Sequence, residues 1–324
     1  MRLLVTGGAG FLGSHFVARV LAADDAGIDV DALTVLDKLT YAGNEANLAP
    51  VRDDPRLRFV CGDIGDAGLL AQLVPGHDAV VNFAAETHVD RSIAGPAPFV
   101  LTNVLGLQVL LDACRDAKVA RVLQISTDEV YGSIDVGSWP ESAPLQPSSP
   151  YAASKAAGEH LVMAYHRTYG MDVGSVRSCN AYGPRQHPEK LIPRFITRLL
   201  DGKSVPLYGD GQHVREWLHV DDVCRAAMLV LAHGEPGASY NIGGGTELTN
   251  RELTDRLLVL LDATADRIEP VTDRPGHDRR YSVDATRIRA LGWEPLRPFE
   301  PGLRETVEWY REHESWWRTL TQRA

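Results

Sequence analysis

The sequence predicts an α/β protein built on a doubly wound parallel sheet, followed by a smaller C-terminal lobe. Over the first 180 residues, short apolar β-type runs alternate with segments of helical periodicity. This alternation is typical of right-handed crossovers between parallel strands. Beyond about residue 180 the chain is punctuated by Pro and Gly and carries Arg and His. We therefore expect one domain over residues 1–180 and a second over 181–324, with a soft and interleaved boundary.

The expected elements follow in chain order. Runs of apolar and β-branched residues predict strands near 2–6, 33–37, 57–61, 79–84, 121–126 and 173–179. Apolar residues that recur every three or four positions predict helices near 11–23, 98–117 and 150–169. In the second part they predict short helices near 191–201, 221–233, 249–262 and 301–312. No internal repeat or low-complexity tract interrupts this order.

A glycine-rich turn joins the first predicted strand to the first predicted helix. Gly7 permits a tight turn, Gly10 lets a pyrophosphate approach the helix N-terminus, and Gly13 allows helix and strand to pack closely. The next strand ends at Asp37, whose carboxylate suits a ribose diol and repels a 2′-phosphate, although Lys38 weakens that repulsion. These features predict a Rossmann-type site that prefers NAD to NADP.

Two later segments predict an active site. Thr127, Asp128 and Glu129 follow the fifth predicted strand, at the carboxyl end where such sheets bind ligands. Tyr151 and Lys155 are four residues apart on a predicted helix, so their side chains share a face. A neighbouring ammonium favours the phenolate, and we therefore expect the pKa of Tyr151 to fall toward that of a general base. Either segment alone is compatible with an exposed group of charges, but both together after a nucleotide-binding start indicate catalysis.

Composition restricts the partners and the compartment. The formal net charge of −10 argues against nucleic acid. Four widely spaced cysteines predict reduced, buried thiols, and the scattered histidines give no metal-ligand spacing, so we expect no metal. The chain enters a strand at once, which leaves no room for a signal peptide, and no apolar run is expected to reach membrane-spanning length. The sequence therefore predicts a cytoplasmic protein without a membrane partner.

The motifs together resemble those of the extended short-chain dehydrogenase/reductases that modify nucleotide sugars, and in particular the dTDP-glucose 4,6-dehydratases. The resemblance runs from residue 3 to about 284. Besides the three glycines, it rests on residues 83–92, 126–132, 151–155, 188–193 and 215–217. It implies conversion of dTDP-glucose to dTDP-4-keto-6-deoxyglucose. In that reaction carbon 4 is oxidised by NAD⁺, water is eliminated across carbons 5 and 6, and hydride returns to carbon 6.

The resemblance also implies roles in this chemistry. Tyr151, assisted by Lys155, would take the proton from the carbon-4 hydroxyl, to which Thr127 would hydrogen-bond. Glu129 would take the proton from carbon 5, and a protonated Asp128 would donate to the hydroxyl that leaves carbon 6. Two adjacent carboxylates disfavour double ionisation, which is one route to a neutral Asp beside an ionised Glu.

Binding residues are implied in the same way. The cofactor set comprises Gly7, Gly10, Phe11, Leu12, Gly13, Asp37, Lys38, Leu39, Thr40, Asp63, Ile64, Phe83, Ala84, Ala85, Thr87, Thr102, Tyr151 and Lys155. The substrate set comprises Thr87, Thr127, Asn180, Lys190, Leu191, Pro206, Leu207, Tyr208, Arg215, Asn250, Arg274 and His277. Guanidinium groups suit a pyrophosphate. The helices near 98–117 and 150–169, with apolar residues on more than one stripe, are implied to form a homodimer interface.

Three residues depart from the family pattern. Thr87 stands where Ser is usual, and Arg185 stands where an aromatic residue is usual. Ala181 replaces an Asn that bonds the nicotinamide end of the cofactor. Loss of one hydrogen bond costs ~0.5–1.5 kcal/mol. We therefore expect weaker cofactor retention.

Two alternative functions share parts of this pattern. The 4-epimerases lack the acid pair, and the related decarboxylases keep the Glu while replacing the Asp, so the presence of both Asp128 and Glu129 disfavours each of them. A catalytically silent NAD-binding regulatory protein would not need Tyr151, Lys155 and both acids together. The dehydratase reaction is the function that uses all four.

Overall fold

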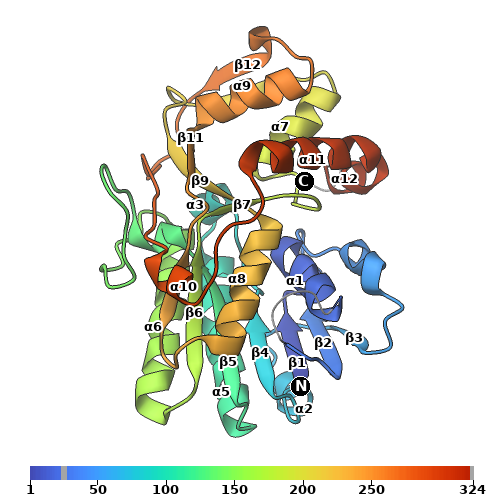
Figure 1. The fold of residues 1–324 in the computed structure, drawn as a ribbon, viewed down its shortest axis with the longest axis vertical. Helices are drawn as coiled ribbons and strands as arrows, with labels where there is room; N and C mark the ends of the chain where they lie inside the picture. Colours follow the sequence, from blue (N-terminus) through green and yellow to red (C-terminus); the bar gives the residue numbers. More distant parts are fainter. Residues whose placement is uncertain (23–27, 322–324) are drawn as a thin grey trace.

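The computed structural model describes residues 1–22 and 28–321, with a larger lobe around a central sheet and a smaller lobe above it (Figure 1). The central sheet has seven parallel strands in the order β10-β6-β5-β4-β1-β2-β3. The strand order reverses between β1 and β4, as the predicted doubly wound fold requires. The strands are β1 (Arg2–Thr6), β2 (Ala32–Asp37), β3 (Leu57–Cys61), β4 (Ala79–Asn82), β5 (Arg121–Thr127), β6 (Val173–Ser178) and β10 (Ser239–Ile242).

Both faces of the sheet are covered by helices. Along β1, Leu3 and Val5 join one buried cluster with Phe16, whereas Leu4 joins another with Leu70. Because successive strand residues point to opposite faces, a strand buried on both sides is apolar throughout. One face carries α1 (Phe11–Leu21) and α8 (Val220–His233), and the other carries α2 (Ala67–Leu73), α5 (Leu107–Asp116) and α6 (Pro150–Tyr169).

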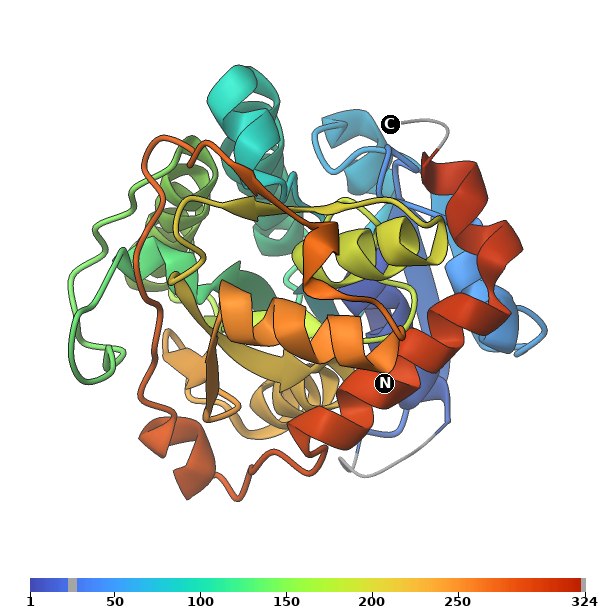
Figure 2. The ribbon, with the colours of Figure 1, turned by 90° about the horizontal axis from the view of Figure 1, so that it is seen from above.

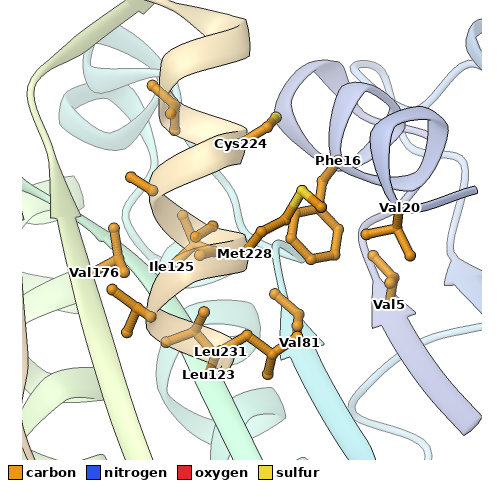
Figure 3. Packing of buried hydrophobic residues seen from close by; sticks show 14 of the residues in the cluster. Val5, Phe16, Val20, Val81, Leu123, Ile125, Val176, Cys224, Met228 and Leu231 are labelled. Carbon is orange, nitrogen blue, oxygen red and sulfur yellow. The ribbon is translucent and has the colours of Figure 1, made fainter. Parts of the chain in front are cut away.

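The first face shows how the helices fit the sheet. Phe16 of α1 and Met228 of α8 meet over Val5, Val81 and Ile125 (Figure 3). All five side chains are at most 5% exposed. The last residue of the helix expected near 11–23 lies outside the described residues.

Residues 97–116 form one helical segment in three parts: α4 (Ala97–Val100), the π-helix η2 (Leu101–Gly106) and α5. The segment is long and apolar enough to cross a membrane by length and composition, with a mean hydropathy of 1.5. The expectation that no apolar run reaches this length is therefore wrong. Leu107, Leu110 and Leu111 pack in the core, whereas Val100 and Leu101 are 53% and 58% exposed.

The smaller lobe is built from short elements. Viewed from above, its helices lie over the central sheet (Figure 2). They are α7 (Leu191–Leu200), α9 (Asn250–Leu260), α11 (Phe299–Glu312) and α12 (Glu314–Thr321). Its strands form one sheet of β11 (Thr246–Thr249), β9 (Val214–His219) and β7 (Asn180–Tyr182), and another of β12 (Ile268–Val271) and β8 (Val205–Tyr208). Phe195, Tyr310 and Trp317 are buried at its centre.

The chain passes between the lobes more than once. After β9 in the smaller lobe it returns to the central sheet as α8 and β10. The division at residue 180 stays a prediction about folding units. The remaining short elements are η1 (Glu45–Val51), α3 (Val89–Ala94), η3 (Asp128–Tyr131), η4 (Ala265–Arg267) and α10 (Thr286–Ala290).

The four cysteines are free thiols, as the sequence predicts. Cys114, Cys179 and Cys224 are buried, but Cys61 is exposed at the end of the edge strand β3. The prediction of burial is therefore wrong for Cys61, because an edge strand has no neighbour to cover it on one side.

Candidate active site

A cavity of about 270 Å³ lies at the carboxyl ends of the central strands. It brings together most of the predicted cofactor and catalytic residues. Those that line it are Gly7, Gly10, Phe11, Leu12, Gly13, Asp37, Lys38, Thr40, Asp63, Ile64, Phe83, Ala84, Ala85, Thr87, Thr127, Asp128, Glu129, Tyr151, Lys155, Asn180 and Lys190. Those that lie outside its lining are Leu39, Thr102, Leu191, Pro206, Leu207, Tyr208, Arg215, Asn250, Arg274 and His277.

The glycine-rich turn has the close contacts that the sequence predicts. Gly7 has φ +69°, and a Cβ there would lie 2.4 Å from the backbone nitrogen of Ala84. A Cβ on Gly13 would lie 2.2 Å from the carbonyl oxygen of Gly7. Larger residues would therefore push α1 away from the turn, and with it the helix N-terminus that faces the cavity.

The acid at the end of β2 is held by its own backbone surroundings. Asp37 Oδ2 accepts from the Ala9 amide at 2.9 Å, and Oδ1 accepts from the Leu39 amide at 2.8 Å. Lys38 is paired with Asp63 at 2.6 Å and not with Asp37. The carboxylate thus keeps a fixed position at the cavity wall, with its remaining lone pairs available to a ribose hydroxyl.

The two adjacent acids have different surroundings. Asp128 is 2% exposed, and its pKa is raised well above its usual range by burial and by the charges of Glu129 and Glu216. Burial also raises the pKa of Glu129, but the cationic side chains of Arg274, Lys190 and Arg215 oppose that rise. Asp128 is therefore the acid that favours protonation, and Glu129 is the acid that favours ionisation.

Hydrogen bonding strengthens this distinction. Asp128 Oδ1 accepts from the Thr127 hydroxyl at 3.1 Å, whereas Oδ2 is buried without a partner among the described residues. The Glu129 amide donates to the Thr127 hydroxyl at 3.3 Å. A buried oxygen without a partner is costly unless a ligand or a proton satisfies it. Asp128 Oδ2 is thus suited to carry a proton toward a ligand.

Tyr151 and Lys155 share the cavity, but they do not interact as the sequence predicts. The Lys155 ammonium donates to the Ile125 carbonyl at 2.6 Å, and burial lowers the pKa of Lys155 to about 8. Burial and the charge of Glu129 raise the pKa of Tyr151 well above its usual value. The expected lowering of the Tyr151 pKa is therefore wrong for the protein by itself, because burial and the charge of Glu129 disfavour the phenolate while the Lys155 ammonium bonds the Ile125 carbonyl.

Local contacts fix the helix that carries this pair. Ser149 caps α6 by accepting from the Ala152 amide at 3.1 Å, and the Tyr151 amide donates to Ser92 Oγ at 3.1 Å. Asn103, in the π-helical segment, donates to Ser154 Oγ at 2.8 Å and accepts from the Glu86 amide at 2.9 Å. Asn103 thus ties α6 to the loop after β4, in keeping with the frequent occurrence of π-helical turns at functional sites. No sequence pattern marks this residue.

The predicted substrate residues come from separate segments of the smaller lobe. Arg274 and Tyr208 both bond Asp90 of α3, at 3.2 and 3.0 Å. Arg215 lies over the Tyr281 ring, 4.2 Å from its centre. Lys190 donates to the Thr87 carbonyl at 2.6 Å, and burial lowers its pKa. In the described part of the chain, Asn180 Oδ1, Asn250 Oδ1 and Arg274 Nε are buried without partners.

His277 belongs to a group that the sequence does not reveal. The ligand atoms of His213, Asp273 and His277 lie within 4.8 Å of one another, a spacing that could hold a metal ion. The two imidazole rings are stacked 3.7 Å apart with an interplanar angle of 13°. An ion between stacked rings would lie outside both ring planes, away from the nitrogen lone pairs. The arrangement suits a carboxylate that bonds two neutral rings, and the absence of a metal stays a prediction.

The cavity also contains residues that the predicted site did not include: Leu36, Ala42, Gly43, Gly62, Ile125, Ser126, Ser178, Cys179, Ala181, Gln186, His187 and Glu189. Several of them adjoin predicted residues at strand ends. Gln186 and His187 enter from a loop before Lys190 and carry no motif of their own.

Fold and site together define an enzyme of the extended short-chain dehydrogenase/reductase class. The family model described as GDP-mannose 4,6 dehydratase matches residues 4–306, and the chain belongs to this family.

Named relatives narrow the comparison. A dTDP-glucose 4,6-dehydratase from Actinoplanes sp. is 57% identical over 319 residues, which cover 98% of this chain and 100% of the relative. The crystal structure of DesIV, a dTDP-glucose 4,6-dehydratase from Streptomyces venezuelae with NAD and TYD bound, is 62% identical with a TM-score of 0.98. That match covers 99% of this chain and 100% of DesIV. A UDP-glucose 4-epimerase from Thermus thermophilus in complex with NAD is 34% identical, with a TM-score of 0.87 and coverage of 97% and 100%.

Proposed function

We propose that the protein is an NAD-dependent dTDP-glucose 4,6-dehydratase, a lyase that forms dTDP-4-keto-6-deoxyglucose. The observation that carries the proposal is the contrast between two neighbouring carboxyl groups in one cavity. The strongest charges acting on Asp128 are those of Glu129 and Glu216, which disfavour its ionisation, whereas the strongest charges acting on Glu129 are those of Arg274, Lys190 and Arg215, which favour its ionisation. Elimination of water from a sugar needs one acid and one base at adjacent carbons, and this contrast supplies both.

The cofactor proposal is supported by the shape and chemistry of the cavity. The N-terminus of α1 and the narrow contacts of Gly7 and Gly13 suit a pyrophosphate, and Asp37 suits a ribose diol. Related structures of the same fold contain NAD. NAD⁺, when bound, would supply a hydride acceptor for carbon 4 and, once reduced, the hydride donor for carbon 6.

The first step depends on Tyr151. Its phenolate takes the proton of the carbon-4 hydroxyl as hydride leaves that carbon, and Lys155 keeps an ammonium in the same cavity. Because burial raises the pKa of Tyr151, the phenolate needs positive charge nearby to form at neutral pH. Thr127, which lines the same cavity as Tyr151, holds the hydroxyl of the sugar in line with the phenol.

The second step depends on the two acids. The ketone at carbon 4 makes the hydrogen on carbon 5 acidic, and Glu129 removes it as a proton. The electron pair from the carbon–hydrogen bond forms the double bond between carbons 5 and 6 while the carbon–oxygen bond at carbon 6 breaks. Asp128 protonates the departing hydroxyl, which leaves as water. Hydride at carbon 6 and a proton at carbon 5 complete the product.

The substrate nucleotide is proposed to lie under the smaller lobe. Arg215 and Arg274 suit the pyrophosphate, and Tyr208 offers a ring to the pyrimidine. The unpartnered Asn180 Oδ1 and Asn250 Oδ1 are further polar atoms that a ligand could satisfy. Selectivity for dTDP-glucose over UDP-glucose depends on the contacts between the protein and the nucleobase of the substrate.

The function is tested by product analysis. Purified protein is incubated with dTDP-glucose and, separately, with UDP-glucose. The products are separated, and their masses are measured by mass spectrometry. A product that has lost one water from dTDP-glucose supports the dehydratase. An isomer of unchanged mass supports a 4-epimerase. In a third incubation, with UDP-glucuronate, loss of carbon dioxide supports a decarboxylase.

We also propose that the protein is a cytoplasmic homodimer with no membrane or nucleic-acid partner. Val100, Leu101, Leu105 and Tyr169, on residues 97–116 and α6, are 50–58% exposed. An apolar surface of this kind is typical of a protein interface. Other apolar residues of the two helices expected at that interface are buried within one chain: Leu107, Leu110, Leu111, Val162 and Tyr165. Light scattering at micromolar concentration tests the dimer, and a monomeric mass would contradict it.

A further inference from the structure

Gln186 lies at the reacting end of the cavity and has an unused hydrogen-bond acceptor. Its side chain is 8% exposed and lines the cavity. The amide nitrogen Nε2 donates to the Ala181 carbonyl at 2.9 Å. The amide oxygen Oε1 is buried and has no partner within the described residues. Because a carbonyl accepts only from the amide nitrogen, this contact turns Oε1 away from Ala181.

The position of Gln186 is fixed from two sides. The Tyr310 hydroxyl, fully buried on α11, donates to the Gln186 backbone carbonyl. The bond to Ala181 holds the side chain. Rigid attachment matters because an unpartnered oxygen on a mobile side chain would turn toward water. Here the oxygen is held in place, where a bound ligand can satisfy it.

The strand register identifies the end of the cavity where Gln186 lies. Ser178, at the end of β6, pairs with Thr127, at the end of β5. Cys179, Asn180 and Ala181 continue from Ser178 along the same cavity wall. Gln186, which is bonded to the Ala181 carbonyl, therefore lies beside the wall that continues from the catalytic strand ends, where the proposed reaction requires hydride transfer.

Ala181 stands where the family pattern has an amide side chain directed at the nicotinamide, and Gln186 bonds the backbone of that residue. We propose that Gln186 replaces the missing amide, with Oε1 accepting a hydrogen bond from the carboxamide NH₂ of the nicotinamide ring. The inference rests on the proposed function, because it requires NAD in this cavity. It makes Gln186 a positioning residue for the ring face that receives hydride.

A cofactor analogue tests this bond directly. In 3-acetylpyridine adenine dinucleotide a methyl ketone replaces the carboxamide, so the ring has no N–H to donate. Affinities of the full chain for NAD⁺ and for the analogue are measured by competition against NADH fluorescence. The wild type should prefer NAD⁺ by about fivefold to tenfold, as expected for one hydrogen bond to a buried acceptor.

Two variants test whether Gln186 Oε1 is the atom that accepts this hydrogen bond. Gln186→Met keeps the length of the side chain without a comparable acceptor. The ratio of its affinity for NAD⁺ to its affinity for the analogue should fall close to one. Adding Ala181→Asn to Gln186→Met should restore a preference, because a side-chain amide returns to the same wall. Unchanged thermal stability and unchanged dTDP affinity in Gln186→Met show that the fold and the substrate half are intact.

The outcomes separate this inference from the proposed function. A wild type without preference, or a Gln186→Met variant that keeps the wild-type preference, would overturn the role of Gln186 and leave the dehydratase proposal standing. A change in dTDP-glucose affinity with an unchanged cofactor preference would assign Oε1 to the sugar and also overturn the inference. Failure of the wild type to bind either dinucleotide would overturn the proposed function itself.

Discussion

The cofactor half of the cavity and the substrate half, which continues beyond the cavity lining to Arg215 and Arg274, are built in different ways. In the cofactor half, each acid is held by a partner beside it in the fold: Asp37 accepts from two backbone amides, and Asp63 pairs with Lys38. In the substrate half, Lys190, Arg215 and Arg274 come from separate segments and act together on Glu129. The contacts of the cofactor half therefore fix the positions of its acids, whereas the cations of the substrate half set the protonation of Glu129 and hence the reaction.

The largest expected effect is on an acid of the substrate half. Asp128→Asn keeps the size of the side chain but cannot supply a proton, so turnover should fall about 10²- to 10⁴-fold. Oxidation at carbon 4 precedes water loss, and the absorbance of reduced nicotinamide should therefore accumulate in a single turnover. Asp135→Asn, at an exposed position, is the control. Unchanged turnover in Asp128→Asn would remove this residue from the mechanism.

A cation of the substrate half should have the next largest effect. Arg274→Gln removes a charge that opposes the burial-driven rise in the Glu129 pKa. Loss of a charged contact is worth ~1.5–3 kcal/mol, so KM should rise about 10- to 100-fold. Glu129 must be ionised to act as a base, and its pKa rises further in the variant. The acidic limb of the kcat/KM profile should therefore move to higher pH.

The control for this substitution is Arg279→Gln, because Arg279 is an exposed arginine paired with Asp210. Its pH profile should match that of the wild type. If Arg274→Gln raises KM but leaves the acidic limb in place, the cation binds substrate without tuning Glu129, and the contrast between the two halves is weaker than we describe.

A smaller effect is expected in the cofactor half. Asp37→Asn presents an NH₂ group to one of the two backbone amides that the carboxylate now satisfies. NAD affinity should fall about tenfold, equivalent to ~1.4 kcal/mol. The preference for NAD over NADP should also narrow, since the variant has no negative charge to repel a 2′-phosphate. Equilibrium binding of both cofactors measures this, with the exposed Asp53→Asn as control.

The smallest effect is expected at Ala181. The sequence alone predicts that this site retains NAD less well than one with an amide there. With Gln186 Oε1 available in the same wall, Ala181→Asn should improve NAD affinity by less than about fivefold. Bound NAD after purification, and stimulation by added NAD⁺, measure the change. A larger gain would mean that Gln186 does not compensate for Ala181.

The sequence predicts the larger lobe well because its signals are local. The strands near 2–6 and 57–61 are observed with the same bounds, and the close packing of Gly13 follows from contacts with Gly7 and Gly8 in the same turn. The smaller lobe is harder because β7, β9 and β11 are short, and the pairing that stabilises them joins distant segments. The roles of Asn103 and Gln186 depend on contacts that form only in the folded protein, and no sequence motif marks either residue.

The predictions of protonation also succeed where the signal is local in the sequence and fail where it depends on the fold. The adjacency of Asp128 and Glu129 predicts that one of the two carries a proton, but the choice depends on Glu216 and Arg274, which lie far along the chain. For Tyr151, the neighbouring Lys155 is visible in the sequence, whereas the extent of burial is not. Burial decides the direction of the Tyr151 pKa shift, and the sequence prediction therefore fails there.

The central claim is that the paired acids turn a transient oxidation at carbon 4 into loss of water across carbons 5 and 6. The direct test uses dTDP-glucose carrying deuterium at carbon 4, with the product examined by mass spectrometry and NMR. We expect a product that has lost water and carries the deuterium at carbon 6. A product of unchanged mass with deuterium still at carbon 4 would contradict it.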